Sequence, residues 1–208
     1  AGLAAQDASC PPAVRSILAL LVDEGGIVAR EAVAKPLATL EREQRRLITG
    51  LKVKIGALDL FIPDMLKPEP RRWRSALRAA ASGQAVPALP PESMVVLPTP
   101  PEADRPRLQK LGFRCVGPQM LRVDLVERLA RHAHEARTGK EQPFVDQALA
   151  TSLGLQPQAV AKLMRDLGFR STENEAGWAW KGQMRTRRDE RPAGPANAFA
   201  ALAGLRRG

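Results

Sequence analysis

The 208-residue chain has few of the residue types that build metal sites, disulfide frameworks and aromatic cores. It contains two cysteines, two histidines, three tryptophans, five phenylalanines and no tyrosine. Two isolated cysteines without a CxxC pair, together with two histidines, cannot supply a zinc ligand set. We therefore expect no metal site, and free thiols suited to a reducing cytoplasm. With few aromatics, the core must consist mainly of Leu, Val and Ala, which favours helices.

Motifs of catalysis and membrane insertion are also missing. The sequence contains no GxxxxGK[ST] phosphate loop, no GxSxG and no HExxH. No run of about 18 apolar residues predicts a membrane span, and the opening AGLAAQDASCPPA lacks a signal-peptide pattern. Because the sequence begins without Met, we expect a fragment of a longer protein. The prediction is a cytoplasmic chain with no catalytic residue or cofactor of its own, and without membrane contact.

Positive charge is what the sequence has in excess. Its 32 lysines and arginines against 22 acids give a formal net charge of +10, which is typical of nucleic-acid binding through counterion release. The alternative is compositional drift, since Arg- and Ala-rich proteomes become basic without any polyanionic ligand. The excess lies in two segments. Residues 41–78 hold ten cations and five acids, and residues 181–208 hold seven cations and two acids.

The apolar pattern predicts a mainly helical protein with small β elements. In residues 1–83 it predicts a helix-turn-helix-like start at 13–35, a polar helix at 36–49, one strand from 50 to 62 and a helix ending near Gly83. Prolines then define a connector, residues 84–118, with one edge strand at 94–97. Residues 183–208 have the composition of a basic disordered tail with a short terminal helix.

Residues 119–182 show the order of parts of a winged helix-turn-helix. A helix at 122–138 precedes a short helix ending at Gly154, a second helix beginning at Pro157, and two strands carrying Trp178 and Trp180. Gln158, Lys162 and Arg165 form the outer face of the second helix, where base-reading residues would lie. However, residues 140–182 hold five cations and five acids. This neutral balance favours packing or protein contact over sequence-specific DNA reading.

Three groups of residues are candidates for binding. Lys52 and Lys54 are predicted to share a strand face, and arginines flank Trp73, so that the indole could stack a base beside a phosphate contact. The alternative for this second group is a solvated helix face with Trp73 in the core. The tail would tether nucleic acid by charge alone. These candidates comprise Lys52, Lys54, Arg71, Arg72, Arg74, Arg185, Arg187 and Arg188.

The last residues, NAFAALAGLRRG, suggest a separate protein contact. Phe199, Leu202 and Leu205 recur every three residues after a PAGP spacer, as in a short helical peptide that docks in a groove. The alternative is a frayed chain end.

The segment GLKVKIGALDLFIPDMLKPEPRRWRSAL resembles the C-terminal region of alphaproteobacterial DExH-box helicases similar to the mitochondrial degradosome RNA helicase. The shared string includes Gly50, Val53, Ile55, Gly56, Phe61, Pro63, Leu66, Lys67 and Pro68. The similarity continues through LGFRCVGPQMLRVDLVERLARHAHEAR, LMRDLGFR and GWAWKG, and covers most of residues 40–205. It implies that a longer parent protein hydrolyses ATP with Mg and unwinds RNA or another duplex, using a helicase core upstream of Ala1. None of the ATPase residues falls in this chain.

Three functions follow as expectations. The first is a non-catalytic helicase accessory region that contacts nucleic acid, RNA rather than DNA, and binds a partner. The second is a winged-helix DNA-binding transcriptional regulator that reads duplex through Gln158 and Arg165. The third is a protein-interaction scaffold that depends on residues 196–208.

Overall fold

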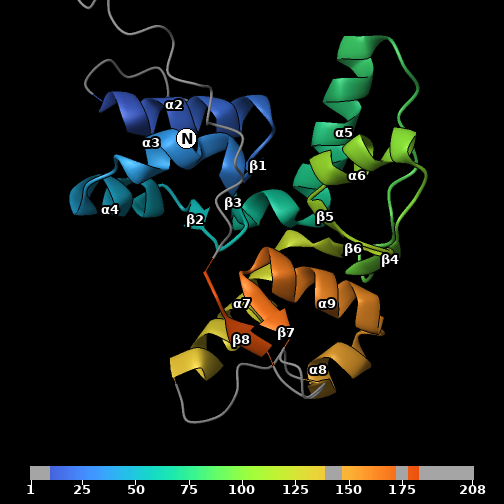
Figure 1. Ribbon diagram of the computed structural model, residues 1–208. Coiled ribbons are helices and arrows are strands. Elements are labelled where there is room, and N and C mark those ends of the chain that lie inside the picture. The colour runs from blue at the N-terminus through green and yellow to red at the C-terminus, as the bar shows by residue number, and fades with distance from the viewer. Residues whose placement is uncertain (1–9, 139–146, 172–177, 183–208) are drawn as a thin grey trace, which may run out of the picture.

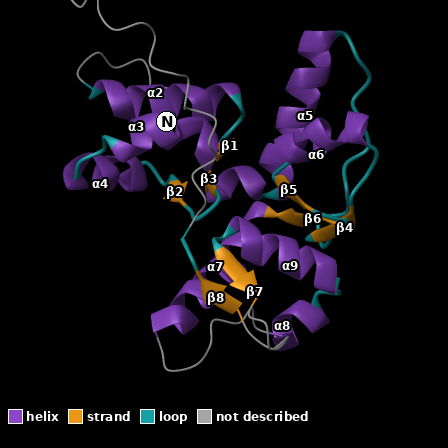
Figure 2. Cartoon of the chain, in the orientation of Figure 1, coloured by secondary structure: helices purple, strands orange, loops and turns teal. Residues whose placement is uncertain are grey.

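The computed structural model describes residues 10–138, 147–171 and 178–182 (Figure 1). Helices predominate, and the strands form two three-stranded antiparallel sheets and one two-stranded sheet (Figure 2). The expectation of a helical protein with small β elements is confirmed at this level.

An N-terminal body is built from residues 12–61. It contains the helices α2 (Pro12–Asp23), α3 (Ala34–Ala38) and α4 (Arg42–Gly50), the 3₁₀ turn η1 (Arg30–Val33), and the strands β1 (Ile27–Ala29), β2 (Lys54–Ile55) and β3 (Asp59–Phe61). The strand order is β1-β3-β2. Val14, Ile17, Leu18 and Leu21 form the buried stripe of α2, because helical periodicity places them on one side. Gly25 and Gly26, both with positive φ, end the helix as predicted.

Three expectations for this body are wrong. The helix-turn-helix-like start predicted at residues 13–35 is one helix, α2, followed by the strand β1 and the 3₁₀ turn η1. The strand predicted over residues 50–62 is a hairpin of two short strands that turns at Gly56. Period-two alternation continues across the turn, so it does not reveal the break. The helix predicted over residues 36–49 is two helices, with Thr39 to Glu41 between them. In the capping pair of α4, the Glu41 backbone N–H donates to Gln44 Oε1 at 3.2 Å, which restarts the helix.

The next element is α5 (Pro68–Ser82), which follows the 3₁₀ turn η2 (Pro63–Leu66). Gly83 caps it in the left-handed conformation, with φ of 65°, as its sequence predicts.

Residues 84–122 are more ordered than a connector. They contain β4 (Val96–Pro98), the 3₁₀ turn η3 (Glu102–Asp104), α6 (Arg105–Lys110), β5 (Phe113–Val116) and β6 (Gln119–Arg122). The sheet order β4-β6-β5 makes β4 an edge strand, as predicted, although it begins two residues later than expected. Proline fits this edge because Pro98 has no N–H to donate.

A C-terminal body follows, made of α7 (Val123–Thr138), α8 (Gln147–Ser152), α9 (Pro157–Asp166) and the hairpin β7 (Phe169–Ser171) and β8 (Trp178–Trp180). The predicted order of helices and strands is present. Leu163, Met164, Leu167 and Phe169 pack with the inner face of α7 in one hydrophobic cluster. Trp178 packs partly against that cluster, whereas Trp180 is 44% exposed.

The hairpin turn between β2 and β3 joins the two bodies. Leu58 is buried in the C-terminal cluster and Ala57 packs against it, although the strands β2 and β3 on either side of the turn belong to the N-terminal sheet. The Ala57 backbone N–H donates to Glu127 Oε2 of α7 at 2.7 Å. Arg30 Nη1 donates to the Gly56 carbonyl at 2.6 Å. These contacts fix the turn from both sides and make one continuous packed structure.

Within the described ranges, no helix is both long and apolar enough to cross a bilayer.

Candidate nucleic-acid interface

Exposed cations lie on α4 and on the hairpin that follows it. Arg45 points inward: its Nη2 donates to the Leu37 carbonyl at 2.9 Å and its Nε to the Leu40 carbonyl at 3.3 Å. These bonds fix the turn between α3 and α4. Arg42 and Arg46 on the same helix are exposed. One arginine of α4 therefore orients the helix, while two are free to act at the surface.

Lys52 and Lys54 extend this group, although they do not share a strand face as predicted. Lys52 lies in the turn after α4 with φ of 61°, while Lys54 lies on the edge strand β2. Lys52 Nζ is 4.0 Å from Asp64, and Lys54 Nζ is 5.8 Å from the centre of the Phe61 ring. Both side chains are exposed. We call the four exposed cations Arg42, Arg46, Lys52 and Lys54 the α4–β2 basic surface.

The arginines of α5 do not form the predicted cluster around Trp73. Arg71 and Arg74 are 3% and 8% exposed, whereas Trp73 is 64% exposed. Arg72 is on the surface and pairs with Glu92 at 2.6 Å. The expected alternative, with Trp73 in the core, is also wrong. The burial pattern of α5 is the reverse of the one that hydropathy predicts: two arginines are buried and the indole is exposed.

Arg71 and Arg74 carry buried charge with incomplete compensation. Arg71 lies with its guanidinium carbon 5.5 Å from the centre of the Phe113 ring, and Arg74 Nη1 donates to the Gly25 carbonyl. The Nε and Nη2 atoms of both arginines have no hydrogen-bond partner among the described residues. Burial, followed by the charges of Arg78 and Arg71, lowers the pKa of Arg74 to about 10.

A basic groove of about 390 Å³ runs between α5, the segment after it and α6. Its lining contains four cations and no carboxylate: Arg74, Arg78, Arg107 and Lys110. Three of these residues were not predicted from the sequence. The signal within the sequence was the spacing of Arg71, Arg74 and Arg78, which places them along one side of a helix. Arg107 and Lys110 come from α6, and only the tertiary fold brings them to α5.

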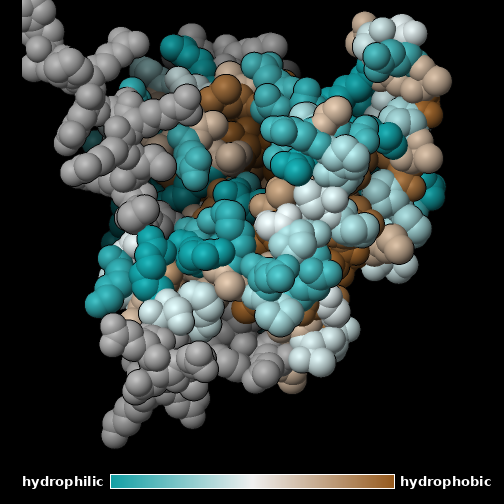
Figure 3. Space-filling model, turned by 45° about the vertical axis from the view of Figure 1, so that its right-hand side comes forward, coloured by the Kyte–Doolittle hydropathy of each residue, from teal (hydrophilic) through white to brown (hydrophobic). Residues whose placement is uncertain are grey.

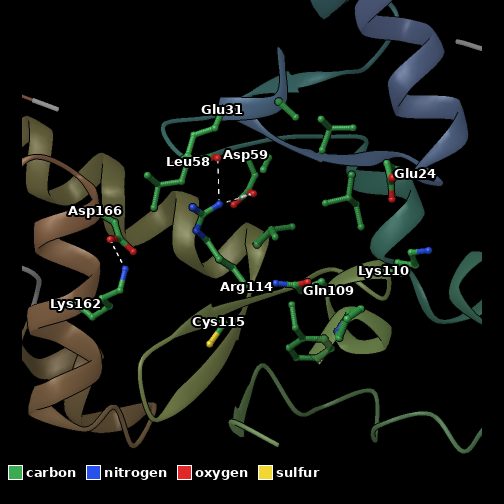
Figure 4. Close-up of a pocket in the computed structure, with 17 residues that line it drawn as sticks. Glu24, Glu31, Leu58, Asp59, Gln109, Lys110, Arg114, Cys115, Lys162 and Asp166 are labelled. Carbon is green, nitrogen blue, oxygen red and sulfur yellow. Dashed lines mark hydrogen bonds and ion pairs between the residues drawn. The ribbon is translucent and has the colours of Figure 1, made fainter. Parts of the chain in front are cut away.

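A second cleft, of about 510 Å³, lies between the N-terminal body and β5 (Figure 4). Figure 4 shows Arg114 reaching from β5 to Asp59 and to the Leu58 carbonyl, at 2.7 and 3.2 Å. Both side chains are largely buried. Burial raises the pKa of Asp59, and the Arg114 charge partly opposes that rise. The lining of this cleft holds both cations and carboxylates, so its walls favour neither an anionic nor a cationic ligand.

The outer face of α9 is partly covered. Lys162 pairs with Asp166 one turn later and is half-buried, whereas Gln158 and Arg165 are exposed. A Cβ built on Gly117 would lie 3.8 Å from Lys162 Cβ, so the β5–β6 turn lies beside this face. The Gln119 side chain bridges the same region: its Nε2 donates to the Gly154 carbonyl and its Oε1 accepts from the Gln156 N–H.

The tail candidates Arg185, Arg187, Arg188, Phe199, Leu202 and Leu205 lie outside the described residues. The two cysteines, Cys10 and Cys115, are free thiols.

In the part of the chain that the structure describes, no three His, Cys, Asp or Glu side chains lie close enough together to bind a metal ion.

Comparison with known proteins found no matching family model, no matching curated protein and no matching solved structure.

On the face of the molecule shown in Figure 3, hydrophilic residues cover much of the surface, and hydrophobic residues are exposed in smaller areas between them.

Proposed function

We propose that this chain is a non-catalytic accessory region that binds nucleic acid, RNA in preference to DNA, through contacts to the phosphate backbone. The α4–β2 basic surface is the observation that carries this proposal. Among the described residues, Arg42, Arg46 and Lys54 have no carboxylate within 4 Å, and Lys52 is only at the limit of pairing with Asp64. Unpaired surface cations gain free energy when phosphates release their counterions.

The element order supports the same role. Helix, strand, two helices and a hairpin follow one another in residues 12–61, with strand order β1-β3-β2. We propose that this body is a winged helix in which α4 takes the place of the recognition helix. Residues 119–182, predicted from the sequence as a winged helix, are a second candidate. In the N-terminal body the hairpin turn is buried against α7, so α4 and the adjoining lysines are left to contact nucleic acid.

The resemblance to DExH-box helicases supports a parent enzyme. In this proposal, ATP hydrolysis and strand separation belong to a helicase core outside this chain. The accessory region would hold the strand by charge, in a way that does not depend on sequence. A partner contact by residues 196–208 is also part of the proposal and rests on their sequence spacing alone.

The test measures the affinity of the whole chain for a labelled single-stranded RNA, by fluorescence anisotropy, at several salt concentrations. For single strands, the slope of log K against log salt becomes shallower by about 0.7 for each phosphate that the protein no longer neutralises. We expect Arg42→Gln/Arg46→Gln to lower the affinity and to reduce this slope by the equivalent of about one to two phosphates. Lys52→Gln/Lys54→Gln should act in the same direction.

The matched control is Arg128→Gln/Arg131→Gln, which removes two exposed cations from α7. It should retain most of the affinity. Absence of binding to the wild-type chain even at low salt would refute the proposal. Equal losses of affinity in the control and in the α4 variant would show that net charge acts without a defined surface.

A duplex-reading DNA regulator is the second candidate, because Gln158 and Arg165 are exposed on α9. It predicts a preference for one duplex sequence, and Gln158→Ala/Arg165→Ala would abolish that preference. Affinity that is equal across duplex sequences would exclude it.

A further inference from the structure

The groove between α5 and α6 concentrates positive charge at one place. Arg74 and Arg78 come from α5, and Arg107 and Lys110 come from α6, which lies beside it (Figure 1). None of the residues that line the groove is acidic. Two other partly buried arginines of the described structure, Arg114 and Arg122, are each paired with an aspartate. The buried arginine of the groove, like its neighbour Arg71, has no such carboxylate partner within the described residues.

Arg74 is the most buried of the four groove cations, and we call it the floor of the groove. It donates one hydrogen bond to the Gly25 carbonyl, but no carboxylate of the described residues neutralises its charge. Arg74 is only 8% exposed, and its Nε and Nη2 atoms have no hydrogen-bond partner in the described structure. A buried charge without a counter-charge is costly. The charged neighbours that act on it are arginines, and they lower its pKa further instead of restoring it. An anion in the groove would remove part of this cost.

The rim supplies groups that can contact such an anion directly. Arg78 is partly exposed, while Arg107 and Lys110 are exposed. Arg107 also donates to the Ala88 carbonyl and so fixes the segment that forms one wall. Ser75 and Gln84 add polar atoms to the lining. Two guanidinium groups and an ammonium group around one small space match the geometry and charge of a phosphate.

We propose that this groove is a phosphate-binding site that holds a phosphate group of a nucleic-acid strand. Arg78, Arg107 and Lys110 contact the phosphate oxygens, and Arg74 supplies a fixed positive potential from below. The site is separate from the α4–β2 basic surface. The identity of the strand as its ligand rests on the proposed function, whereas binding of phosphate itself does not.

The first experiment uses inorganic phosphate and the whole chain. Thermal unfolding is followed in phosphate and in chloride at equal ionic strength. When phosphate reaches roughly ten times its Kd, linkage predicts that Tm rises by about 3 to 6 °C. Part of any rise is a general effect of phosphate on protein hydration. The informative quantity is therefore the difference in the phosphate-dependent rise between the wild-type chain and matched variants.

Arg78→Gln/Lys110→Gln removes two groove cations that form no ion pair within the described residues, and we expect it to abolish the site-specific part of the rise. Arg128→Gln/Arg131→Gln removes the same charge from α7 and should leave the rise intact. Arg74→Met keeps the volume of the floor and removes its charge. It should also lose the phosphate-dependent rise, and its Tm in chloride should stay equal or increase. Equal phosphate effects in all four proteins would overturn the site.

The second experiment identifies the source of the phosphate. In ¹H–¹⁵N spectra of the whole chain, phosphate should shift the amides of Gln84 and Lys110, and a short single-stranded RNA should shift the same amides and displace the phosphate. RNA that binds without affecting these amides would overturn the strand assignment, even if the α4–β2 basic surface is confirmed. Phosphate binding with no RNA binding anywhere would overturn the proposed function and leave the anion site standing.

Discussion

Asp59 and Arg114 form the most buried ion pair in the described structure, with side chains 9% and 19% exposed. Asp59 belongs to the N-terminal body, and Arg114 lies on β5 of the sheet with strand order β4-β6-β5. Asp59 Oδ2 has no hydrogen-bond partner among the described residues, so the carboxylate depends on Arg114 for compensation. At this scale, stability depends on whether a charge placed in the interior keeps its partner.

Arg114→Met should destabilise the chain by about 3 to 5 kcal/mol at neutral pH, because it leaves Asp59 buried and unpaired. The double variant Asp59→Leu/Arg114→Met should recover most of this loss. Chemical denaturation of the wild-type chain and the two variants gives the free energy of unfolding of each. A double variant no more stable than the single one would show that the pair is not the source of the effect.

The same pair gives a dependence on pH. Because burial raises the pKa of Asp59 above its usual value, the folded chain holds this proton more tightly than the unfolded chain. Protonation of Asp59 therefore contributes to the free energy of unfolding. This contribution is complete below about pH 4 and is lost as the pH rises through the folded-state pKa of Asp59. Removing Arg114 leaves burial unopposed. The penalty of Arg114→Met should thus be smaller at pH 4 than at pH 7, in parallel denaturant titrations. A penalty independent of pH would contradict this.

Lys52 combines a backbone cost with an exposed charge. Its φ of 61° lies in the left-handed region, where a side chain costs about 1 to 2 kcal/mol. Lys52→Gly should therefore stabilise the chain by up to about 1 kcal/mol in denaturation, while it weakens RNA binding because a cation is removed. Lys54→Gln is the companion that loses charge without relief of strain. If Lys52→Gly destabilises the chain, the turn gains more from the side chain than the backbone loses.

At the scale of the element, α5 shows how far pattern alone can mislead. Trp73 and Leu77 are 64% and 66% exposed, and they lie one turn apart on the outside of the helix. Arg71, Arg74, Ser75 and Ala79 are on the inside. Hydropathy would place these groups the other way round. The reason for the inversion is that the inner face meets the Gly25 carbonyl and the Phe113 ring, and not an aliphatic surface.

Trp73→Ala should change the free energy of unfolding by no more than about 0.5 kcal/mol, since the indole is mostly in solvent. A core tryptophan would cost about 3 to 5 kcal/mol. Far-UV denaturation curves distinguish the two values. A large loss of stability would place Trp73 in a packed environment and contradict the exposed face of α5.

The sequence predicts an element correctly where one local signal decides it. The stripe of α2, the glycine cap of α5, the proline start of α9 and the β7–β8 hairpin all follow from short-range patterns. Prediction fails where a turn interrupts a continuous pattern, as at Gly56 and between α3 and α4. The sequence carries a signal for the α5 half of the basic groove but none for the whole groove, because the two halves of its charge come from elements about 30 residues apart that only packing brings together.

At the scale of the molecule, the turn between β2 and β3 holds the N-terminal and C-terminal bodies together. Gly56 is enclosed: a Cβ there would lie 2.7 Å from the Asp59 carbonyl oxygen and would also clash with the Glu127 carboxylate. Because Leu58 packs in the C-terminal cluster, displacement of this turn would disturb both bodies. We expect unfolding of the described bodies to be a single cooperative event.

Gly56→Ala should cost about 1 to 3 kcal/mol through overpacking and should lower one common transition, seen at the same midpoint by far-UV circular dichroism and by tryptophan fluorescence. Gly50→Ala is the control. A Cβ at Gly50, the last residue of α4, meets nothing within 4 Å, so alanine there should be neutral or slightly stabilising. Separate midpoints in the two signals would contradict a shared core.

Residues 83–86 are an exposed stretch at which a protease can reach the backbone. A single cut there breaks the covalent link between the two halves of the chain. It leaves Leu58 packed in the C-terminal cluster and Glu127 bound to the hairpin turn. The two fragments should therefore elute together on gel filtration and part only in denaturant. Boundaries drawn from the proline content of the sequence would instead give two half-proteins, each with an exposed hydrophobic surface where the other had been.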